Sequence, residues 1–265
     1  MGWSVYLINI MKNKFSEENK SEDYIYGRNP VIEALKSDAS IDCIYLSGKT
    51  GTLSRIYAMA RDKGIVVKQT TDAKLSQMTD NASHQGVMAQ VACGKYVSLE
   101  ELIEISKNKN KPAFIILCDE IEDPHNLGAI IRTAESAGAD GIIIPKRRSA
   151  TLNATVYKTS AGAASYLPVA KVSNLSSAIE TLKKNNIWIY GTDASGECYT
   201  DTDLTGNICL VIGSEGFGIG KKIASECDFM LSLPMYGKVT SLNASVASAI
   251  FIYEAVRQRR IKGVV

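Results

Sequence analysis

Histidine is scarce in this chain of 265 residues, which contains two, and none of its six cysteines forms a C-x-x-C pair. Structural zinc sites use four closely spaced cysteine or histidine ligands, so this scarcity argues against such a site. Because no secretory signal indicates an oxidising compartment, we interpret the cysteines as free thiols in a reducing cytoplasm. Cys43, Cys118 and Cys209 fall in apolar runs typical of strands, where cysteine behaves as a small hydrophobe.

Long hydrophobic runs and a strong net charge are also missing. The apolar stretch VYLINIM near the start is too short to span a membrane, and Met11 is a second possible start. The net charge of +2 does not favour a histone-like binder, although it permits local basic patches. Three basic runs occur, and the simplest interpretation of each is a solvated surface: Lys107, Lys109 and Lys111; Lys146, Arg147 and Arg148; and Arg257, Arg259, Arg260 and Lys262.

Alternating apolar runs and helical patterns divide the chain into two α/β units. We expect a disordered leader over 1–23, a small α/β domain over 24–96, a linker over 97–112 that begins as a helix, and a larger α/β domain over 113–265. Strand-like runs such as AFIILCD, GIIIP and ICLVIGSEG predict a mostly parallel sheet that is covered on both faces. Ligands bind beyond the carboxyl ends of such strands, here near Thr192, Gly213 and Pro234.

The segment EDPHNLGAIIRTAESAGA, from Glu122 to Ala139, has the periodicity of a packed helix. A helical wheel places Arg132 on the side of Gly128 and Glu135. From periodicity alone, Arg132 is a surface residue that pairs with Glu135. The opposite arc carries the apolar stripe, which consists of Leu127, Ile130, Ile131, Ala134 and Gly138.

Two further segments carry polar residues at the ends of predicted strands. GSEGFGIG, from Gly213 to Gly220, fits neither the dinucleotide-binding nor the P-loop pattern. It is either a loop whose backbone approaches a ligand closely, with Glu215 in the turn, or a plain tight turn before a helix. In LPMYGKVTSLNASVASAIFIYEA, Asn243 or Ser241 is best placed to cap a long helix. Small residues in that helix permit close packing within the chain or against a second subunit.

Three segments resemble, in their order along the chain, the three motifs of the SpoU (TrmH-type) RNA ribose 2′-O-methyltransferases of the SPOUT superfamily. They are DPHNLGAIIRTAESAGA, LVIGSEGFGI and LPMYGKVTSLNASVASAI. This resemblance covers roughly residues 113–260. The N-terminal segments YIYGRNPVIEAL and HQGVMA resemble the small RNA substrate-binding domain of the RlmB-type enzymes, which methylate a guanosine of 23S ribosomal RNA. The resemblance implies a SPOUT α/β domain with a deep trefoil knot, preceded by a small ribosomal-protein-like α/β RNA-binding domain.

The resemblance also implies a cofactor, a partner subunit and site residues. S-adenosyl-L-methionine would bind in the knot, and the protein would be a homodimer through its C-terminal domain. The matching cofactor positions are Thr192, Gly213, Leu233 and Leu242. The matching catalytic set is Asn126, Arg132, Glu215, Ser241 and Asn243. The RNA-binding candidates are Arg28, Asn29, His84 and Gln85, which could instead form local turn structure.

Methyl transfer to a ribose hydroxyl needs no metal, but the hydroxyl proton must leave. His125 is the generic candidate for a base, whereas the resemblance assigns the activation of the hydroxyl to Arg132. Because arginine is normally fully protonated, Arg132 would act either as a tuned base or by stabilising the developing alkoxide. Asn126 and Asn243 would orient Arg132 and the ribose, and Glu215 would fix its loop or hold Arg132.

Other functions remain open from the sequence. A transfer RNA ribose 2′-O-methyltransferase is the first alternative, and an antibiotic-resistance-type enzyme acting on a ribosomal RNA adenosine is another. A non-catalytic, ribosome-associated RNA-binding protein belongs to a different class, and the intact polar motif positions argue against it. In each case the partner is RNA, and no membrane is involved.

Overall fold

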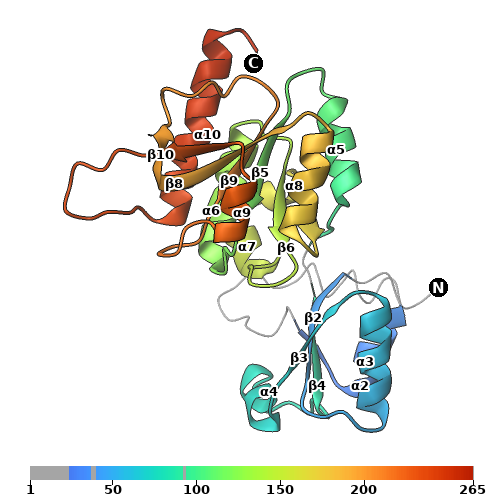
Figure 1. Ribbon diagram of the computed structural model, residues 1–265. Coiled ribbons are helices and arrows are strands. Elements are labelled where there is room, and N and C mark those ends of the chain that lie inside the picture. The colour runs from blue at the N-terminus through green and yellow to red at the C-terminus, as the bar shows by residue number, and fades with distance from the viewer. Residues whose placement is uncertain (1–23, 37–39, 92–93, 265) are drawn as a thin grey trace.

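The computed structural model describes residues 24–36, 40–91 and 94–264, so the expected leader over 1–23 lies outside the described residues. The described chain forms two sheets, each with its own helices (Figure 1). The N-terminal sheet has four strands in the order β1-β4-β2-β3, and the C-terminal sheet has six in the order β10-β8-β9-β5-β6-β7. None of the described helices is long and apolar enough to cross a membrane.

The N-terminal unit is a mixed sheet with helices packed on it. Its elements are β1 (Tyr24–Tyr26), α2 (Arg28–Lys36), β2 (Ile41–Leu46), α3 (Thr52–Asp62), β3 (Val66–Gln69), α4 (Asp72–Met78) and β4 (Val87–Val91). Strand β4 is antiparallel to β1 and β2, and β3 is parallel to β2. Apolar residues of α2 and α3 pack against one face of the sheet in a single buried cluster. The sequence did not predict β1, because three residues are too few to show a period.

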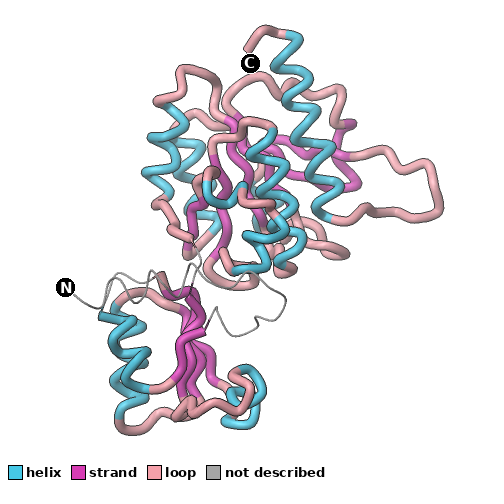
Figure 2. The backbone as a smooth tube through the Cα atoms, turned by 180° about the vertical axis from the view of Figure 1, so that it is seen from behind, coloured by secondary structure: helices cyan, strands magenta, loops and turns pink. Residues whose placement is uncertain are grey.

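The C-terminal unit is a parallel sheet with helices on both faces, as the sequence predicted (Figure 2). Its elements are α5 (Leu99–Lys107), β5 (Phe114–Cys118), α6 (Pro124–Ser136), β6 (Gly141–Pro145), α7 (Ala154–Thr159), the 3-10 helix η1 (Ala163–Ser165), β7 (Val169–Val172), α8 (Leu175–Lys184), β8 (Trp188–Cys198), β9 (Ile208–Ile212), α9 (Lys221–Glu226), β10 (Phe229–Ser232) and α10 (Ala244–Ile261).

Strand β5 is apolar at every position, and its packing explains why. Phe114, Ile116 and Cys118 face the core beneath α6 and α10, whereas Ile115 and Leu117 face the core beneath α5 and α8. Both faces are therefore buried, as is typical of parallel sheets. Helix α5 contributes Leu99, Leu102 and Ile103 to the second core, so the stretch expected to be a linker over 97–112 packs on the C-terminal sheet.

The sequence left several elements of this unit unassigned. Helices α7 and α9 have six residues each, and β7 is a four-residue edge strand, so their patterns are too short to recognise. Helix α8 carried a readable signal, because its buried residues recur at helical spacing: Leu175, Ala178, Ile179 and Leu182.

Two of the basic runs are not plain solvated surface. Lys109 and Lys111 both form ion pairs with the buried Asp140. Arg259 is 1% exposed, and its guanidinium donates to four backbone carbonyls, those of Pro112, Ala113, Leu204 and Gly206. Helical periodicity could not reveal this, because the acceptors come from loops far away in the sequence. Burial lowers the pKa of Arg259 to about 10.

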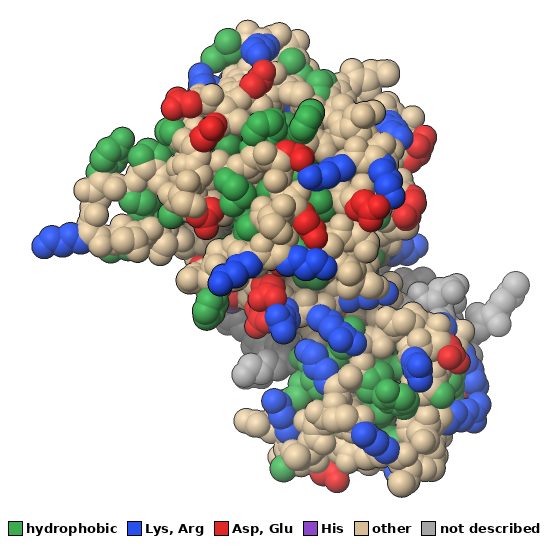
Figure 3. Space-filling view, in the orientation of Figure 1, with side chains coloured by type: hydrophobic (Ala, Val, Ile, Leu, Met, Phe, Trp, Pro, Cys, Tyr) green, Lys and Arg blue, Asp and Glu red, His purple; other side chains and the backbone are tan. Residues whose placement is uncertain are grey.

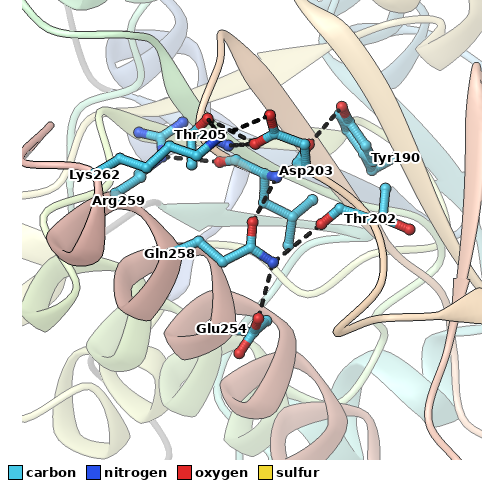
Figure 4. Close-up of polar contacts among 9 residues, drawn as sticks. Tyr190, Thr202, Asp203, Thr205, Glu254, Gln258, Arg259 and Lys262 are labelled. Atoms are coloured by element: carbon cyan, nitrogen blue, oxygen red, sulfur yellow. Dashed lines mark hydrogen bonds and ion pairs between the residues drawn. The ribbon is translucent and has the colours of Figure 1, made fainter.

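Arg259 anchors α10 to the rest of the C-terminal unit. In Figure 4, the side chains of Gln258 and Arg259 on α10, and of Lys262 just after it, extend toward the segment over 202–205. Gln258 bonds to Leu204 and Thr202 on either side of Asp203, which pairs with Lys262. The C-terminal helix is therefore held by polar contacts as well as by its apolar face.

We expect Arg259→Met to lower the free energy of unfolding by at least about 3 kcal/mol, because it leaves buried carbonyls without donors. Urea unfolding followed by circular dichroism measures this loss. The matched control is Arg260→Ala, at the exposed neighbouring position, which should stay within about 0.5 kcal/mol of wild type. Equal stability of the two variants would contradict the anchoring role.

Candidate active site

The candidate site lies where the strand order of the large sheet reverses direction. From β5 the chain adds β6 and then β7 on one side, whereas β9 pairs with the other side of β5. Helix α6 follows β5, and the loop that begins at Gly213 follows β9. The neighbouring carboxyl ends of β5 and β9 therefore bring the start of α6 beside this loop, at the kind of crevice where open parallel sheets bind ligands.

Three polar side chains from the three motif segments meet there. The Asn126 amide donates to Glu215 Oε1 at 2.9 Å, and the Asn243 amide donates to Asn126 Oδ1 at 3.0 Å and also to Glu215 Oε1. The backbone N–H of Ala244 lies 3.4 Å from the same carboxylate oxygen. Glu215 therefore fixes its loop to α6 and α10. Within the described residues of one chain, no ion pair joins Glu215 to Arg132.

Helix caps explain why these side chains are so placed. Asp123 caps α6 by accepting from His125 N–H at 2.9 Å, and Pro124 occupies the first turn. Asn243 caps α10 through Oδ1, which accepts from the N–H groups of Ser245 and Val246. The cap predicted at Asn243 or Ser241 is therefore Asn243. Its amide nitrogen stays available for Asn126 and Glu215.

The glycine loop after β9 closes on itself. Ser214 and Gly218 exchange two backbone hydrogen bonds, of 3.0 and 2.9 Å. A Cβ on Gly213 would lie 2.1 Å from the carbonyl carbon of Gly218, so no larger residue fits without moving the backbone. This chain therefore uses glycine at position 213 for close backbone approach within the loop.

A cavity of about 410 Å³ opens beside this loop. Its lining includes all four residues expected to bind the cofactor, namely Thr192, Gly213, Leu233 and Leu242, and it also includes Glu215 and Ser241. Thr192 was expected in a loop, but it lies within β8, which continues along β10 to Cys198. Its hydroxyl donates to the Val211 carbonyl at 3.0 Å. The sequence did not point to Leu231 and Phe251, which also contribute apolar surface to the lining.

Arg132 stands apart from this cluster. It is exposed on α6, six residues and about 9 Å along the helix from Asn126, and it does not line the cavity. Within the described residues, no ion pair joins it to Glu135, so the predicted surface pair is wrong. The asparagines of the cluster contact each other and Glu215 rather than Arg132.

The helical wheel of α6 needs two corrections. Gly128 was placed on the exposed side with Arg132, but it is buried, because a Cβ there would meet Thr159 Oγ1 of α7 at 1.8 Å. Gly138 was placed in the apolar stripe, but α6 ends at Ser136, and Gly138 is exposed with a left-handed backbone. Helix α7, whose contact with Gly128 determines this face, was not predicted from its six residues.

The four RNA-binding candidates lie at one end of the N-terminal sheet. Arg28 donates from its backbone and from Nε to Gln85, both at 3.1 Å, and Arg28, Asn29 and Gln85 are all exposed. His84 Nδ1 accepts from Gly86 N–H at 3.1 Å, and Nε2 lies 3.0 Å from Ser76 Oγ. Because both ring nitrogens of His84 are engaged locally, His84 supports the turn, and the exposed residues are better placed for a ligand.

Asp119 makes a contact with the end of the glycine loop that the sequence did not predict. It directly follows β5, and its carboxylate accepts from Gly220 N–H at 2.8 Å, at the far end of the glycine loop. Burial raises the pKa of Asp119, and that hydrogen bond opposes the rise. A carboxylate next to a strand end was a readable signal. Within the described residues, no three His, Cys, Asp or Glu side chains are grouped so that they could hold a metal ion.

Comparisons with known proteins agree with this geometry. The SpoU rRNA Methylase family matches residues 113–253, and the family described as RNA 2′-O ribose methyltransferase substrate binding matches residues 24–97. A Bacillus subtilis protein, YacO, whose name assigns it to the TrmH family of tRNA/rRNA methyltransferases, is 45% identical over 92% of this chain and 99% of its own length.

Solved structures share the architecture. The SpoU methyltransferase AviRb of Streptomyces viridochromogenes has a TM-score of 0.58 and 26% identity, over 91% of this chain and 90% of its own. AviRb has also been solved in complex with AdoMet. The TrmH/SpoU tRNA modifying enzyme of A. aeolicus has a TM-score of 0.54 and 28% identity, over 63% of this chain and 84% of its own. The chain therefore belongs to the SpoU (TrmH) family of RNA methyltransferases, which use S-adenosylmethionine as the methyl donor.

Proposed function

We propose that this protein transfers a methyl group from S-adenosylmethionine to the 2′-hydroxyl of a ribose in RNA, at a guanosine of 23S ribosomal RNA. The observation that carries this proposal is the polar cluster of Asn126, Glu215 and Asn243, which joins the three motif segments at the edge of the cavity. These residues belong to three separate segments, and a purely structural role would not require a cavity beside them.

The cavity fits the cofactor. Its volume lies within the range of small-molecule sites. Gly213 brings backbone close to the space, Leu231, Leu233 and Phe251 offer apolar surface, and Thr192 and Ser241 add hydroxyl groups. We propose Thr192, Gly213, Leu233 and Leu242 as the residues that hold the cofactor. The deep trefoil knot expected at this position stays a prediction.

The chain's own residues have two tasks in the reaction. S-adenosylmethionine supplies an already activated methyl group, so the protein must hold the ribose in line and stabilise the oxygen as its proton leaves. We assign that stabilisation to Arg132, because an arginine stays protonated at neutral pH and favours a developing negative charge. Asn126, Glu215, Ser241 and Asn243 would shape the place where the ribose meets the cavity. His125 is exposed at the start of α6 and remains the alternative proton acceptor.

A homodimer through the C-terminal domain would bring Arg132 to a cavity, since Arg132 does not line the cavity of its own chain. Exposed apolar side chains support such an interface. The side chains of Phe217 and Tyr236 are almost fully exposed, at 94% and 95%. Val239 is largely exposed, and Val246 and Tyr253 are about half exposed. Hydrophobic side chains also gather on and beside the loop between β10 and α10, which projects from the molecule (Figure 3). Such surfaces are typical of protein interfaces.

Val246→Asp is expected to convert the dimer to a monomer and to abolish methyl transfer, because it places a charge in the proposed interface. Sedimentation velocity measures the change of mass. Tyr57→Asp is the matched control, since Tyr57 is an exposed apolar residue on α3 of the N-terminal unit. A wild-type protein that sediments as a monomer at working concentrations would contradict the dimer.

Ribosomal RNA is the proposed substrate rather than transfer RNA. The substrate-binding family matches residues 24–97, whereas the A. aeolicus tRNA modifying enzyme covers 63% of this chain. The test uses labelled S-adenosylmethionine with unmodified 23S ribosomal RNA and, separately, unmodified transfer RNA. We expect label in ribosomal RNA. Label in transfer RNA alone would favour the alternative enzyme, and no label in either RNA would favour a non-catalytic binding protein. A cytoplasmic location follows from this substrate and stays a prediction.

A further inference from the structure

A buried polar cluster connects the two units of the chain. It joins Asp42 on β2 to Lys171 on β7 and to Tyr96, which lies between the units. Lys171 forms an ion pair with Asp42 Oδ1, and the Tyr96 hydroxyl donates to the same oxygen at 2.9 Å. The Lys171 ammonium also lies 4.7 Å from the centroid of the Tyr96 ring. The Asp42 side chain is fully buried, and that of Lys171 is 9% exposed.

The cluster continues toward the candidate active site. The Tyr96 oxygen accepts from Leu152 N–H at 2.9 Å, and Leu152 directly precedes Asn153, which caps α7. Thr159 of α7 packs against Gly128 of α6. Helix α6 carries both Asn126 and Arg132, so contacts run without a break from the N-terminal sheet to the helix that holds the motif residues.

The energetics of the cluster indicate that it orients the two units rather than stabilising the fold. Removing an aspartate and a lysine from water is costly, and well-packed apolar residues often serve stability equally well. In addition, Asp42 Oδ2 is buried and has no hydrogen-bond partner. What the arrangement does require is one relative position of β2, β7 and Tyr96. The ion pair and the Tyr96 hydrogen bond share Asp42 Oδ1, and the ion pair and the ring contact share Lys171 Nζ. Burial and the neighbouring charge of Asp42 raise the pKa of Tyr96, so its hydroxyl keeps the proton that it donates.

A second contact restrains the same junction. Lys146 Nζ, just beyond β6, lies 3.4 Å from the carbonyl oxygen of Gly64, just before β3. The two contacts involve the carboxyl-end regions of β6 and β7, which are neighbouring strands of the large sheet. The N-terminal unit is therefore held on the carboxyl-end side of the large sheet, which is also the side of the cavity.

We propose that Asp42, Lys171 and Tyr96 are positioning residues that hold the RNA-binding unit at one fixed angle to the methyltransferase unit. An RNA bound by the N-terminal unit then presents one particular ribose to the cavity. The cluster thus contributes to the choice of nucleotide, which neither unit fixes alone. This inference rests on the proposed function, because it assumes that RNA contacts both units. Small errors of placement far from the chemistry can slow a reaction by about 100-fold.

The test compares Asp42→Asn, Lys171→Met and the double variant with wild type. We expect each single variant to lose at least about 10-fold in the single-turnover rate on 23S ribosomal RNA, with the Kd for S-adenosylmethionine changed less than about two-fold. Small-angle X-ray scattering should show a broader distribution of distances between the units. The double variant leaves no unpaired buried charge, so it should be more thermally stable than the single variants. Its single-turnover rate should still be low, and its distribution of distances between the units should still be broad.

The control is Lys183→Met, which removes an ion pair with Asp228 that lies wholly within the C-terminal unit. It should leave both the rate and the scattering unchanged. A double variant with the wild-type rate and scattering profile would overturn the positioning role, even if the single variants unfold. If the proposed function itself were wrong, the wild type would transfer no label to RNA. The scattering comparison would still show whether the cluster fixes the two units, so the two failures can be told apart.

Discussion

Replacing Arg132 with alanine is expected to slow methyl transfer by at least about 100-fold, the cost of removing one positioned group that stabilises developing negative charge. Cofactor binding should be nearly unchanged, because Arg132 does not line the cavity of its own chain and we assign its role to the ribose oxygen rather than to the cofactor. Stability should also be nearly unchanged, because the side chain is exposed and makes no ion pair within the described residues. Single-turnover transfer of label to RNA measures the rate, and calorimetry with S-adenosylmethionine measures binding.

Glu135→Ala is the matched control for this variant. Glu135 is exposed on the same helix, one turn beyond Arg132, so its removal tests whether any change of surface charge on α6 affects the rate. We expect that control to react within about two-fold of wild type. Arg132→Lys separates charge from geometry, since lysine keeps the charge but lacks the planar group of donors. Wild-type turnover by Arg132→Ala would rule out Arg132 as the catalytic group.

Gly213→Ala is expected to weaken binding of S-adenosylmethionine by at least about 100-fold, equivalent to about 2.7 kcal/mol. The added methyl group would lie 2.1 Å from the backbone of Gly218, so the loop that lines the cavity must open or move. Glu215 would then lose its place beside Asn126 and Asn243. Calorimetry measures the affinity, and circular dichroism verifies that the sheet is intact.

The control for the loop is Gly206→Ala. Gly206 lies just before β9 begins, and nothing lies within 4 Å of the added methyl group there. That variant should bind the cofactor as wild type does. If Gly213→Ala also bound normally while remaining folded, the loop would not form part of the cofactor site, and the assignment of Gly213 would have to be withdrawn.

Local patterns predicted much of this fold because the relevant physics is local. The central strands β5, β6 and β9 are buried on both faces, so they are visible as continuous apolar runs such as AFIILC. The start of α10 was narrowed to two candidate caps because only certain side chains satisfy the free N–H groups of a helix. Strand ends with polar or glycine-rich neighbours also indicated the edge where the cavity lies.

Contacts between distant segments were not predictable in the same way. Arg259 resembled one more exposed charge in a basic run, but its four carbonyl acceptors come from two loops elsewhere in the chain. Gly128 was misplaced because α7, which covers it, has only six residues. Asp42 and Lys171 are 129 positions apart, and no spacing rule connects them.

The roles of the motif residues were open for the same reason. Periodicity placed Arg132 on the exposed side of its helix, and the structure agrees. It could not decide whether Glu215 holds the loop or the arginine. Within the chain, Glu215 contacts Asn126 and Asn243, and Arg132 is exposed on α6.

The most direct test of the account is the chemical position of the transferred methyl group. Wild-type protein, labelled S-adenosylmethionine and unmodified 23S ribosomal RNA are combined, and the product is digested to nucleosides and analysed by mass spectrometry. We predict one labelled 2′-O-methylguanosine, together with loss of alkaline cleavage at that single position, since a methylated 2′-oxygen cannot attack the adjacent phosphate. Label on a base, or efficient transfer with every ribose left unmodified, would contradict the account.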